Sequence, residues 1–290
     1  MAGPAVGLSR FLTVNRRVIS VALTKVRGSS PREAGTEMFV AASAAWGTIG
    51  GGQLEFRAIE AARRMLDDGQ LSRVIDLPLG PKIGQCCGGH VEITLRRMRA
   101  SDRRAACLCA EQAAESRPHV YILGAGHVGR ALADLFQHLP VRCILVDPRT
   151  DEVALCSARV ETRVSAIPEF DVAQAPTGSA FIVLTHDHGL DFLVASRALE
   201  RGDATYVGMI GSATKRAKLL RWMCEHSHAE AFDGLTCPIG AGGSRDKRPS
   251  VIAAFVVAEV MAKLTAQTAT QCLSQTPATG EHTDRAEARS

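Results

Sequence analysis

The chain has 290 residues, of which 46% are hydrophobic and 22% are charged, and its formal net charge is +4. These fractions are typical of globular proteins and argue against a fibrous repeat or a mainly disordered chain, and the length suffices for two domains. Basic residues are scattered rather than gathered in one stripe, so nucleic acid is not an expected partner. The N-terminus has no signal-peptide pattern and the longest apolar run, 251–257, is short, which predicts a cytoplasmic protein without a membrane segment.

The first part of the chain, residues 1–98, is predicted to form a small mixed α/β domain. Apolar alternation predicts strands that close a small mixed sheet, and apolar residues at helical spacing predict one helix between Leu54 and Leu66. The predicted strands are 18–26, 37–41, 45–49, 72–77 and 90–95. Residues 99–117 are rich in Ala and Glu and are predicted to be a helical connector between domains.

From residue 118 to residue 264 the pattern becomes strand, turn, helix, strand. Short apolar strands are predicted at 119–123, 142–146, 180–184 and 205–210, and a last helix at 249–264. Strands and helices that alternate in this way predict a parallel sheet covered on both faces. Residues 265–290 are polar, Thr-rich and without periodicity, which predicts a disordered tail.

The strongest local signal in this second part is a glycine turn between a strand and a helix. Gly124 allows a tight turn, Gly126 allows the backbone to approach a phosphate, and Gly129 allows the helix to pack closely on the strand. Asp147 ends the next strand, where it would accept hydrogen bonds from a ribose or cap its own loop. The fold class is therefore predicted to be α/β, with the small mixed domain followed by a Rossmann-like parallel-sheet domain.

A second glycine turn, with Gly211 and Ser212, ends a later strand and precedes a basic helix. Its amide groups and the charge of Lys215 or Arg216 are predicted to face the same sheet edge as the first turn, although a simple turn followed by a solvated helix fits equally well. Another strand end carries Thr185-His186-Asp187-His188. This segment is interpreted either as a metal or proton-relay site or as a surface cluster.

Two adjacent thiols are the sharpest chemical feature. Gln85, Cys86 and Cys87 lie between glycines, a setting that gives no bulk to bury the sulfur atoms. Such thiolates can ligate a soft metal, act as nucleophiles or form a strained disulfide with each other. The total of nine cysteines is odd and their spacing lacks paired C-x-x-C motifs, so neither a disulfide framework nor structural zinc is expected.

Two further loops carry candidate binding residues. The loop 28–35 offers hydroxyl groups and the guanidinium of Arg32 after the first strand. The triple glycine 50–52 opens the first helix, with Gln53 and Glu55 in its first turn, where a carboxylate either faces a ligand or stabilises the helix dipole.

Taken together, these motifs resemble those of the XdhC/CoxI family, which includes xanthine dehydrogenase accessory proteins. The resemblance extends from about residue 15 to residue 264, and the Gln-Cys-Cys-Gly-Gly loop upstream of the glycine turn is its most specific part. The matching stretches are GSSPREAGTEM (28–38), GTIGGGQLE (47–55), GQCCGGHVEI (84–93), VYILGAGHVGRAL (120–132), LTHDHGLD (184–191), YVGMIGSATKRAKL (206–219) and a stretch from CPIGAGG to RPSVIAAFVVAEVMA (237–262).

The resemblance implies a homodimeric chaperone rather than an enzyme. Its cargo would be molybdenum cofactor in the molybdopterin form, with a cysteine desulfurase as sulfur donor and the molybdenum subunit of xanthine dehydrogenase as recipient. It implies that Cys86 or Cys87 ligates the metal and that the terminal phosphate binds at the 124–129 turn. Two alternatives remain open: an NAD(P)-dependent oxidoreductase, suggested by the glycine turn and Asp147, and a cysteine-based redox or thiol-transfer protein.

Overall fold

The structure is a computed structural model that describes residues 4–80, 88–225, 234–244 and 246–274. The chain divides into two compact units, Met1–Ser116 (unit 1) and Arg117–Ser290 (unit 2). Each unit has its own hydrophobic core.

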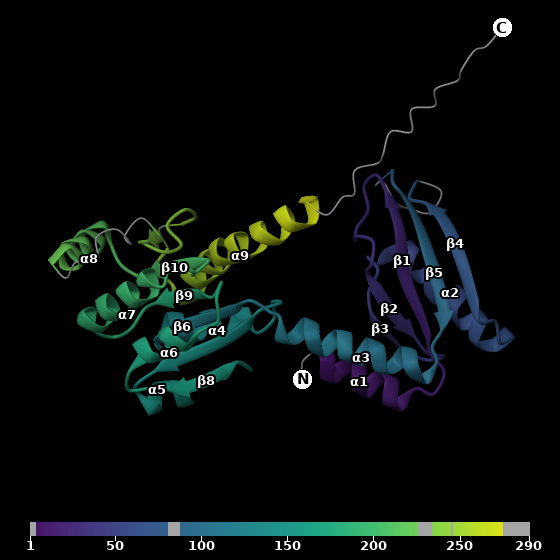
Figure 1. The fold of residues 1–290 in the computed structure, drawn as a ribbon, viewed down its shortest axis with the longest axis horizontal. Helices are drawn as coiled ribbons and strands as arrows, with labels where there is room; N and C mark the ends of the chain where they lie inside the picture. The colour runs from purple at the N-terminus through teal and green to yellow at the C-terminus, as the bar shows by residue number, and fades with distance from the viewer. Residues whose placement is uncertain (1–3, 81–87, 226–233, 245, 275–290) are drawn as a thin grey trace, which may run out of the picture. The chain divides into compact units, whose positions relative to one another are not determined.

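Unit 1 contains a five-stranded sheet with the strand order β3-β2-β1-β5-β4 (Figure 1). Its strands are β1 (Ile19–Arg27), β2 (Glu37–Val40), β3 (Ala45–Gly47), β4 (Ser72–Pro78) and β5 (His90–Arg97). Every pairing is antiparallel, so the sequence-based expectation of a mixed sheet is wrong. Three of the four pairs, β1–β2, β2–β3 and β4–β5, join strands that are consecutive in the chain, and consecutive strands that pair directly are antiparallel.

One face of this sheet is covered by α2 (Gly52–Asp68). The helix buries an apolar stripe that includes Leu54, Ala58 and Met65, and this stripe packs on the inward-facing residues of β1 and β5. It ends at Gly69, whose φ of 72° is the left-handed conformation that suits a glycine C-cap. The predicted helix is thus confirmed by its packing.

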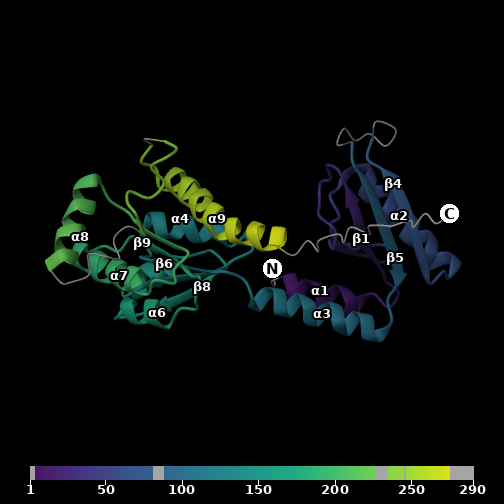
Figure 2. The same ribbon diagram turned by 45° about the horizontal axis from the view of Figure 1, so that its top comes forward.

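Two helices, α1 (Pro4–Val14) and α3 (Ala100–Glu115), lie side by side in unit 1 (Figures 1 and 2). The guanidinium of Arg103 on α3 donates to the carbonyl groups of Leu12, Asn15 and Arg16 at the end of α1. Leu12 lies in the last turn of α1, and Asn15 and Arg16 follow it, so Arg103 satisfies carbonyl groups where the helical hydrogen bonds end. The helix predicted as a connector, α3, therefore lies within unit 1, and α1 was missed by the sequence analysis.

Unit 2 contains a six-stranded parallel sheet with the order β11-β10-β9-β6-β7-β8. Its strands are β6 (His119–Leu123), β7 (Arg142–Asp147), β8 (Glu161–Val164), β9 (Ala180–Val183), β10 (Tyr206–Met209) and β11 (Leu235–Thr236). The chain starts in the middle of the sheet and builds outward in both directions, which is the doubly wound arrangement. The predicted Rossmann-like fold is confirmed.

Helices cover both faces of the parallel sheet, as its buried strands require. On one face α4 (His127–Phe136) and α9 (Pro249–Ser274) lie side by side over Val120, Ile122 and Leu145. On the other face, α6 (Pro168–Gln174), α7 (His188–Glu200) and α8 (Ala213–Glu225) pack over the alternate strand residues. A short helix, α5 (Thr150–Ala154), follows β7 (Figure 1).

The last helix is longer than predicted. It continues to Ser274, whereas the sequence analysis placed the start of an irregular tail at Thr265, because residues 265–274 contain no glycine or proline that would end a helix. By length and composition, Pro249–Ala266 is the one segment of the described residues that could cross a membrane. Within this segment, Ala253, Val256 and Val260 are buried in the core of unit 2.

Candidate functional site

Three loops of unit 1 meet at one end of its sheet, and we call residues 28–36, 47–55 and 88–89 the loop cluster. A Cβ atom on Gly50 would lie 2.6 Å from Cγ of Pro31, so the second loop contacts the first without room for a side chain. Ser29 and Gly88 form a parallel β-bridge, and a Cβ on Gly89 would lie 2.0 Å from the carbonyl oxygen of Ser29. The structure therefore brings together loops that the sequence analysis singled out separately.

Within the loop cluster, Glu55 binds backbone rather than facing outward. Its Oε2 accepts hydrogen bonds from Oγ1 of Thr48 at 2.5 Å and from the N–H groups of Ile49 and Gly51, each at 3.1 Å. A carboxylate in the first turn of a helix also stabilises the helix dipole. The geometry matches the capping role that the sequence analysis considered for Glu55.

Ser30 is a residue of the loop cluster that the sequence analysis did not select. Its hydroxyl oxygen is buried and has no hydrogen-bond partner among the described residues. Buried polar atoms are normally paired, so this hydroxyl needs an explanation. Sequence alone offers no signal for it beyond the Gly28-Ser29-Ser30 run, because burial of a hydroxyl depends on which loops pack around it.

The remaining predicted residues of unit 1 fall into two groups. Arg32 and Gln53 are exposed in the loop cluster, with Cγ of Arg32 on the side of the loop that faces Gly50. Gln85, Cys86 and Cys87 lie outside the described residues.

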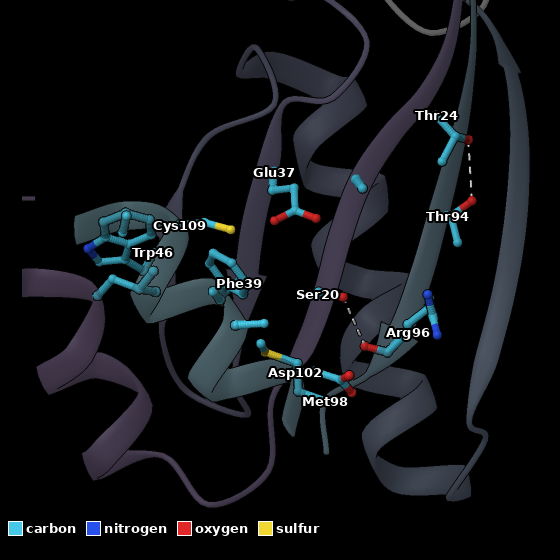
Figure 3. Close-up of a pocket in the computed structure, with 15 residues that line it drawn as sticks. Ser20, Thr24, Glu37, Phe39, Trp46, Thr94, Arg96, Met98, Asp102 and Cys109 are labelled. Carbon is cyan, nitrogen blue, oxygen red and sulfur yellow. Dashed lines mark hydrogen bonds between the residues drawn. The ribbon is translucent and has the colours of Figure 1, made fainter. Parts of the chain in front are cut away.

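The face of the unit 1 sheet opposite α2 carries a groove of about 660 Å³ (Figure 3). Polar residues of the strands, among them Thr24, Glu37 and Arg96, line one part of it, while Phe39 and Trp46 line another. Partial desolvation in the groove raises the pKa of Glu37. None of the site residues predicted from sequence lines this groove.

In unit 2, the glycine turn, residues 124–129, joins β6 to α4. A Cβ on Gly124, whose φ is 132°, would lie 2.2 Å from the carbonyl oxygen of Leu184, and a Cβ on Gly129 would lie 1.9 Å from that of Gly124. Both glycines are therefore needed for packing of the turn itself. Gly126 differs, since its φ is −65° and a Cβ there would meet nothing within 4 Å. This open side is what the approach of a ligand to the backbone requires.

Asp147 is completely buried behind the glycine turn. Its Oδ2 accepts the N–H of Ala125 at 2.7 Å and Nη2 of Arg149 at 2.8 Å, while its Oδ1 accepts the N–H and Nε of Arg149, each at 2.9 Å. Burial alone would raise the pKa of Asp147, but these hydrogen bonds outweigh it and hold the pKa below its ordinary value. The carboxylate is therefore engaged in holding the turn and does not face a ribose.

A cleft of about 580 Å³, the unit 2 cleft, opens between the loops that follow β9 and β10. Gly211 and Ser212 line it, and a Cβ on Gly211 would lie 2.8 Å from Cδ of Lys215, so this glycine makes room for the lysine stem. Thr185 also lines the cleft, and its N–H lies 3.1 Å from the position of a Cβ on Gly124. The two glycine turns thus share one edge of the sheet, as predicted.

A buried ion pair forms part of the unit 2 cleft. Lys215 pairs with Asp191, whose side chain is 1% exposed. Asp191 also accepts the N–H and the hydroxyl of Thr185, each at 2.8 Å, and Lys215 donates to the carbonyl oxygen of Ile210 at 3.0 Å. Lys215 was one of the two cations predicted from sequence, whereas Asp191 was not predicted, because its only signal is a carboxylate in the first turn of the helix that follows β9.

The histidines that flank the cleft do not form a metal site in this structure. His186 and His188 both line the cleft, but the Asp187 side chain between them caps α7 by accepting the N–H of Leu190 at 2.8 Å. Across the described residues, no group of three or more His, Cys, Asp and Glu side chains has the arrangement to hold a metal ion. The Asp187 side chain is therefore engaged in capping α7.

The fold and its loops define a two-domain α/β protein with a Rossmann-type second domain. Residues 120–260 match the XdhC Rossmann domain, and residues 12–76 match the XdhC and CoxI family. The chain belongs to the XdhC and CoxI family, as its sequence motifs indicated.

Comparison with solved structures agrees with this fold. A crystal structure described as a xanthine dehydrogenase from Bacillus halodurans superposes with a TM-score of 0.76 at 16% identity, covering 96% of this chain and 98% of that chain. At that identity the similarity establishes the fold alone. Comparison with curated protein sequences gives no match.

Proposed function

We propose that this protein is a molybdenum cofactor chaperone that supports maturation of xanthine dehydrogenase. Membership of the XdhC and CoxI family supports the role in maturation, and the described Bacillus halodurans structure of the same fold carries the name of that enzyme. In this proposal the cofactor is cargo in the molybdopterin form. It is bound in the cytoplasm by a homodimer, receives its terminal sulfur from a cysteine desulfurase and passes to apo-xanthine dehydrogenase.

The observation that carries the proposal is the loop cluster of unit 1. Three glycine-containing loops pack there, with no room for a side chain at Gly50 or Gly89, and they leave the buried hydroxyl of Ser30 without a partner among the described residues. A polar ligand bound at this end of the sheet would satisfy that hydroxyl. Gly88 and Gly89 immediately follow Cys86 and Cys87 in sequence, so we propose that a thiolate of this pair ligates the metal, a soft-ligand role suited to sulfur.

The residues of unit 2 support the binding of an anion more than that of a dinucleotide. The open side of Gly126 at the start of α4 suits an approaching phosphate. By contrast, the engagement of Asp147 by Ala125 and Arg149 removes the ribose acceptor that an NAD(P)-dependent oxidoreductase would use.

The test is retention of cofactor by the purified full chain. The protein is incubated with released molybdenum cofactor, unbound material is removed, and molybdenum and pterin are measured per chain. We expect Cys86→Ala or Cys87→Ala to lower retention, whereas Cys224→Ala, which removes an exposed thiol of unit 2, serves as the matched control and should leave it unchanged. Equal retention by a folded double Cys→Ala variant and the natural chain would contradict the assignment of the thiols.

A second measurement tests the role in maturation. Loaded protein is mixed with apo-xanthine dehydrogenase, with and without a cysteine desulfurase and its sulfur donor, and the gain in enzyme activity is compared with that from free cofactor. We expect greater activation by the loaded protein, with a further gain when the desulfurase is present. No retention of cofactor and no activation by a well-folded sample would overturn the proposed function as a whole.

A further inference from the structure

The unit 2 cleft has the position and size of a small-molecule site. It lies at the carboxyl ends of β9 and β10, the edge at which open α/β sheets bind their ligands. Its volume of about 580 Å³ falls within the range of pockets that hold molecules of nucleotide size. The residues that line it, from Thr185 to Lys218, all belong to unit 2.

The floor of the cleft presents a fixed cation. Lys215 is 12% exposed, and Asp191 and the carbonyl oxygen of Ile210 accept two of the three N–H bonds of its ammonium group. These contacts hold the group in place, and the third N–H has no acceptor among the described residues. Asp191 in turn accepts three hydrogen bonds, two from Thr185 and one from Lys215, so its negative charge is paired with the Lys215 ammonium group.

The rim of the cleft adds donors and a second positive charge. Lys218 is exposed on the cleft side of α8, and Ser212 and Thr214 place hydroxyl groups at the start of that helix. The N-terminus of a helix carries a partial positive charge as well. Among the described residues that line the cleft, Asp191 is the one acidic residue, and it is paired with Lys215, so this lining favours an anion.

One wall of the cleft is apolar. Phe192 and Ile210 line it, and the Phe192 ring contacts the Trp222 ring with the two centroids 6.3 Å apart. A bare inorganic ion would leave this wall in water, whereas an organic group attached to the anion would cover it. The cleft therefore combines an anion site with a surface for a ring or a sugar.

We propose that the unit 2 cleft binds a phosphate monoester of about mononucleotide size. Lys218, Thr214 and the remaining N–H of Lys215 contact the phosphate, and the organic part lies against Phe192. Asp191 is a positioning residue that holds the Lys215 ammonium toward the ligand. The inference goes beyond the proposed function, because it concerns a ligand site in unit 2 that needs neither the thiols nor the loop cluster.

The test is calorimetric titration of the full chain with three probes, AMP, ribose 5-phosphate and inorganic phosphate. We expect AMP to bind most tightly and inorganic phosphate most weakly. A Thr214→Val/Lys218→Ala variant should bind AMP about tenfold or more weakly, because it loses a charge-assisted hydrogen bond. Lys263→Ala, which removes an exposed lysine of α9 outside the cleft, is the matched control and should bind AMP as the natural chain does.

A second variant tests the ion pair without leaving a buried charge. Lys215→Met alone would strand the Asp191 carboxylate, so Asp191→Asn/Lys215→Met is used, with thermal unfolding to verify the fold. It should also lose AMP binding by about tenfold. No binding of AMP at millimolar concentration by the folded natural chain, or unchanged binding by both cleft variants, would overturn the proposal.

Competition identifies the source of the phosphate in the cell. Displacement of AMP by released molybdenum cofactor would make the cleft a subsite for the pterin phosphate, and displacement by NAD⁺ would make it a nucleotide site. Because AMP and ribose 5-phosphate contain neither molybdenum nor pterin, failure of AMP to bind leaves the cofactor-retention test of the proposed function unaffected, and failure of retention leaves the cleft proposal standing.

Discussion

The loop cluster of unit 1 and the glycine turn of unit 2 each place a carboxylate beside glycine-rich backbone. Glu55 accepts the N–H groups of Ile49 and Gly51, and Asp147 accepts the N–H of Ala125. The two regions differ in the groups that the carboxylate leaves without a contact. In unit 1 a buried hydroxyl, that of Ser30, has no partner among the described residues, while in unit 2 an open glycine, Gly126, faces empty space.

This difference distinguishes residues that stabilise the loops of a site from residues that are free to contact a ligand. Carboxylates were the obvious candidates in both regions, yet both stabilise the backbone of their own loops. The features that suit a ligand are inconspicuous in sequence: a serine in one region and the middle glycine of a motif in the other. The comparison can be tested with substitutions that affect one class of residue without affecting the other.

The largest effect is expected for the glycines that pack against backbone. Gly129→Ala would place Cβ 1.9 Å from the carbonyl oxygen of Gly124, so we expect unit 2 to lose at least about 3 kcal/mol of unfolding free energy or to fail to fold. Gly126→Ala is the matched control, because its Cβ meets nothing within 4 Å and its φ is ordinary. It should change stability by no more than about 0.5 kcal/mol.

The two tryptophans allow each unit to be followed separately. Trp46 lies in unit 1 and Trp222 in unit 2, so the fluorescence of a Trp46→Phe chain during urea unfolding reports unit 2 alone. Similar midpoints for Gly129→Ala and Gly126→Ala in that background would show that the turn is not packed as described.

A smaller effect that depends on pH is expected for Asp147. Asp147→Asn removes a buried carboxylate that holds Ala125 and Arg149, at a cost of about 1–3 kcal/mol in unit 2 at neutral pH. Because the pKa of Asp147 is lower in the folded state, its stabilising contribution is present above the unfolded-state pKa of about 3.9 and is lost as the pH falls through the folded-state pKa. The stability difference between natural chain and variant should therefore shrink below about pH 4, and a difference that stays constant with pH would contradict this account.

For Glu55 we expect a loss of about 1–2 kcal/mol confined to unit 1. Glu55→Gln replaces a charged oxygen that accepts three hydrogen bonds with a neutral and weaker acceptor. Glu60→Gln on the same helix is the control, because Glu60 makes only an exposed ion pair with Arg64, and it should cost less than about 0.5 kcal/mol. The unfolding of unit 1 is followed for both variants in a Trp222→Phe chain. Equal losses of unfolding free energy in the two variants would contradict the capping role of Glu55.

Much of the fold could be predicted because the signals were local. The alternation in β1, the apolar stripe of α2 and the strand–glycine–helix pattern around Gly124 each reflect periodicity or turn chemistry within a short stretch. The antiparallel pairing in unit 1 and the packing of α1 on α3 were not predicted, since both depend on contacts between distant segments. For the same reason the Asp191–Lys215 pair and the burial of the Ser30 hydroxyl were not predicted. Both depend on residues that come from other loops.

The smallest effect on stability, and the most informative one for function, is expected for Ser30. Its hydroxyl makes no hydrogen bond among the described residues, so Ser30→Ala should leave the unfolding free energy of unit 1 within about 0.5 kcal/mol of the natural value or raise it slightly. If the hydroxyl contacts the cofactor, the same variant should retain less molybdenum and pterin per chain. Ser43→Ala, in the turn between β2 and β3 and outside the loop cluster, is the control for both measurements. A clear loss of stability in Ser30→Ala would mean that the hydroxyl already has a partner in the free protein, and unchanged retention would remove Ser30 from the site.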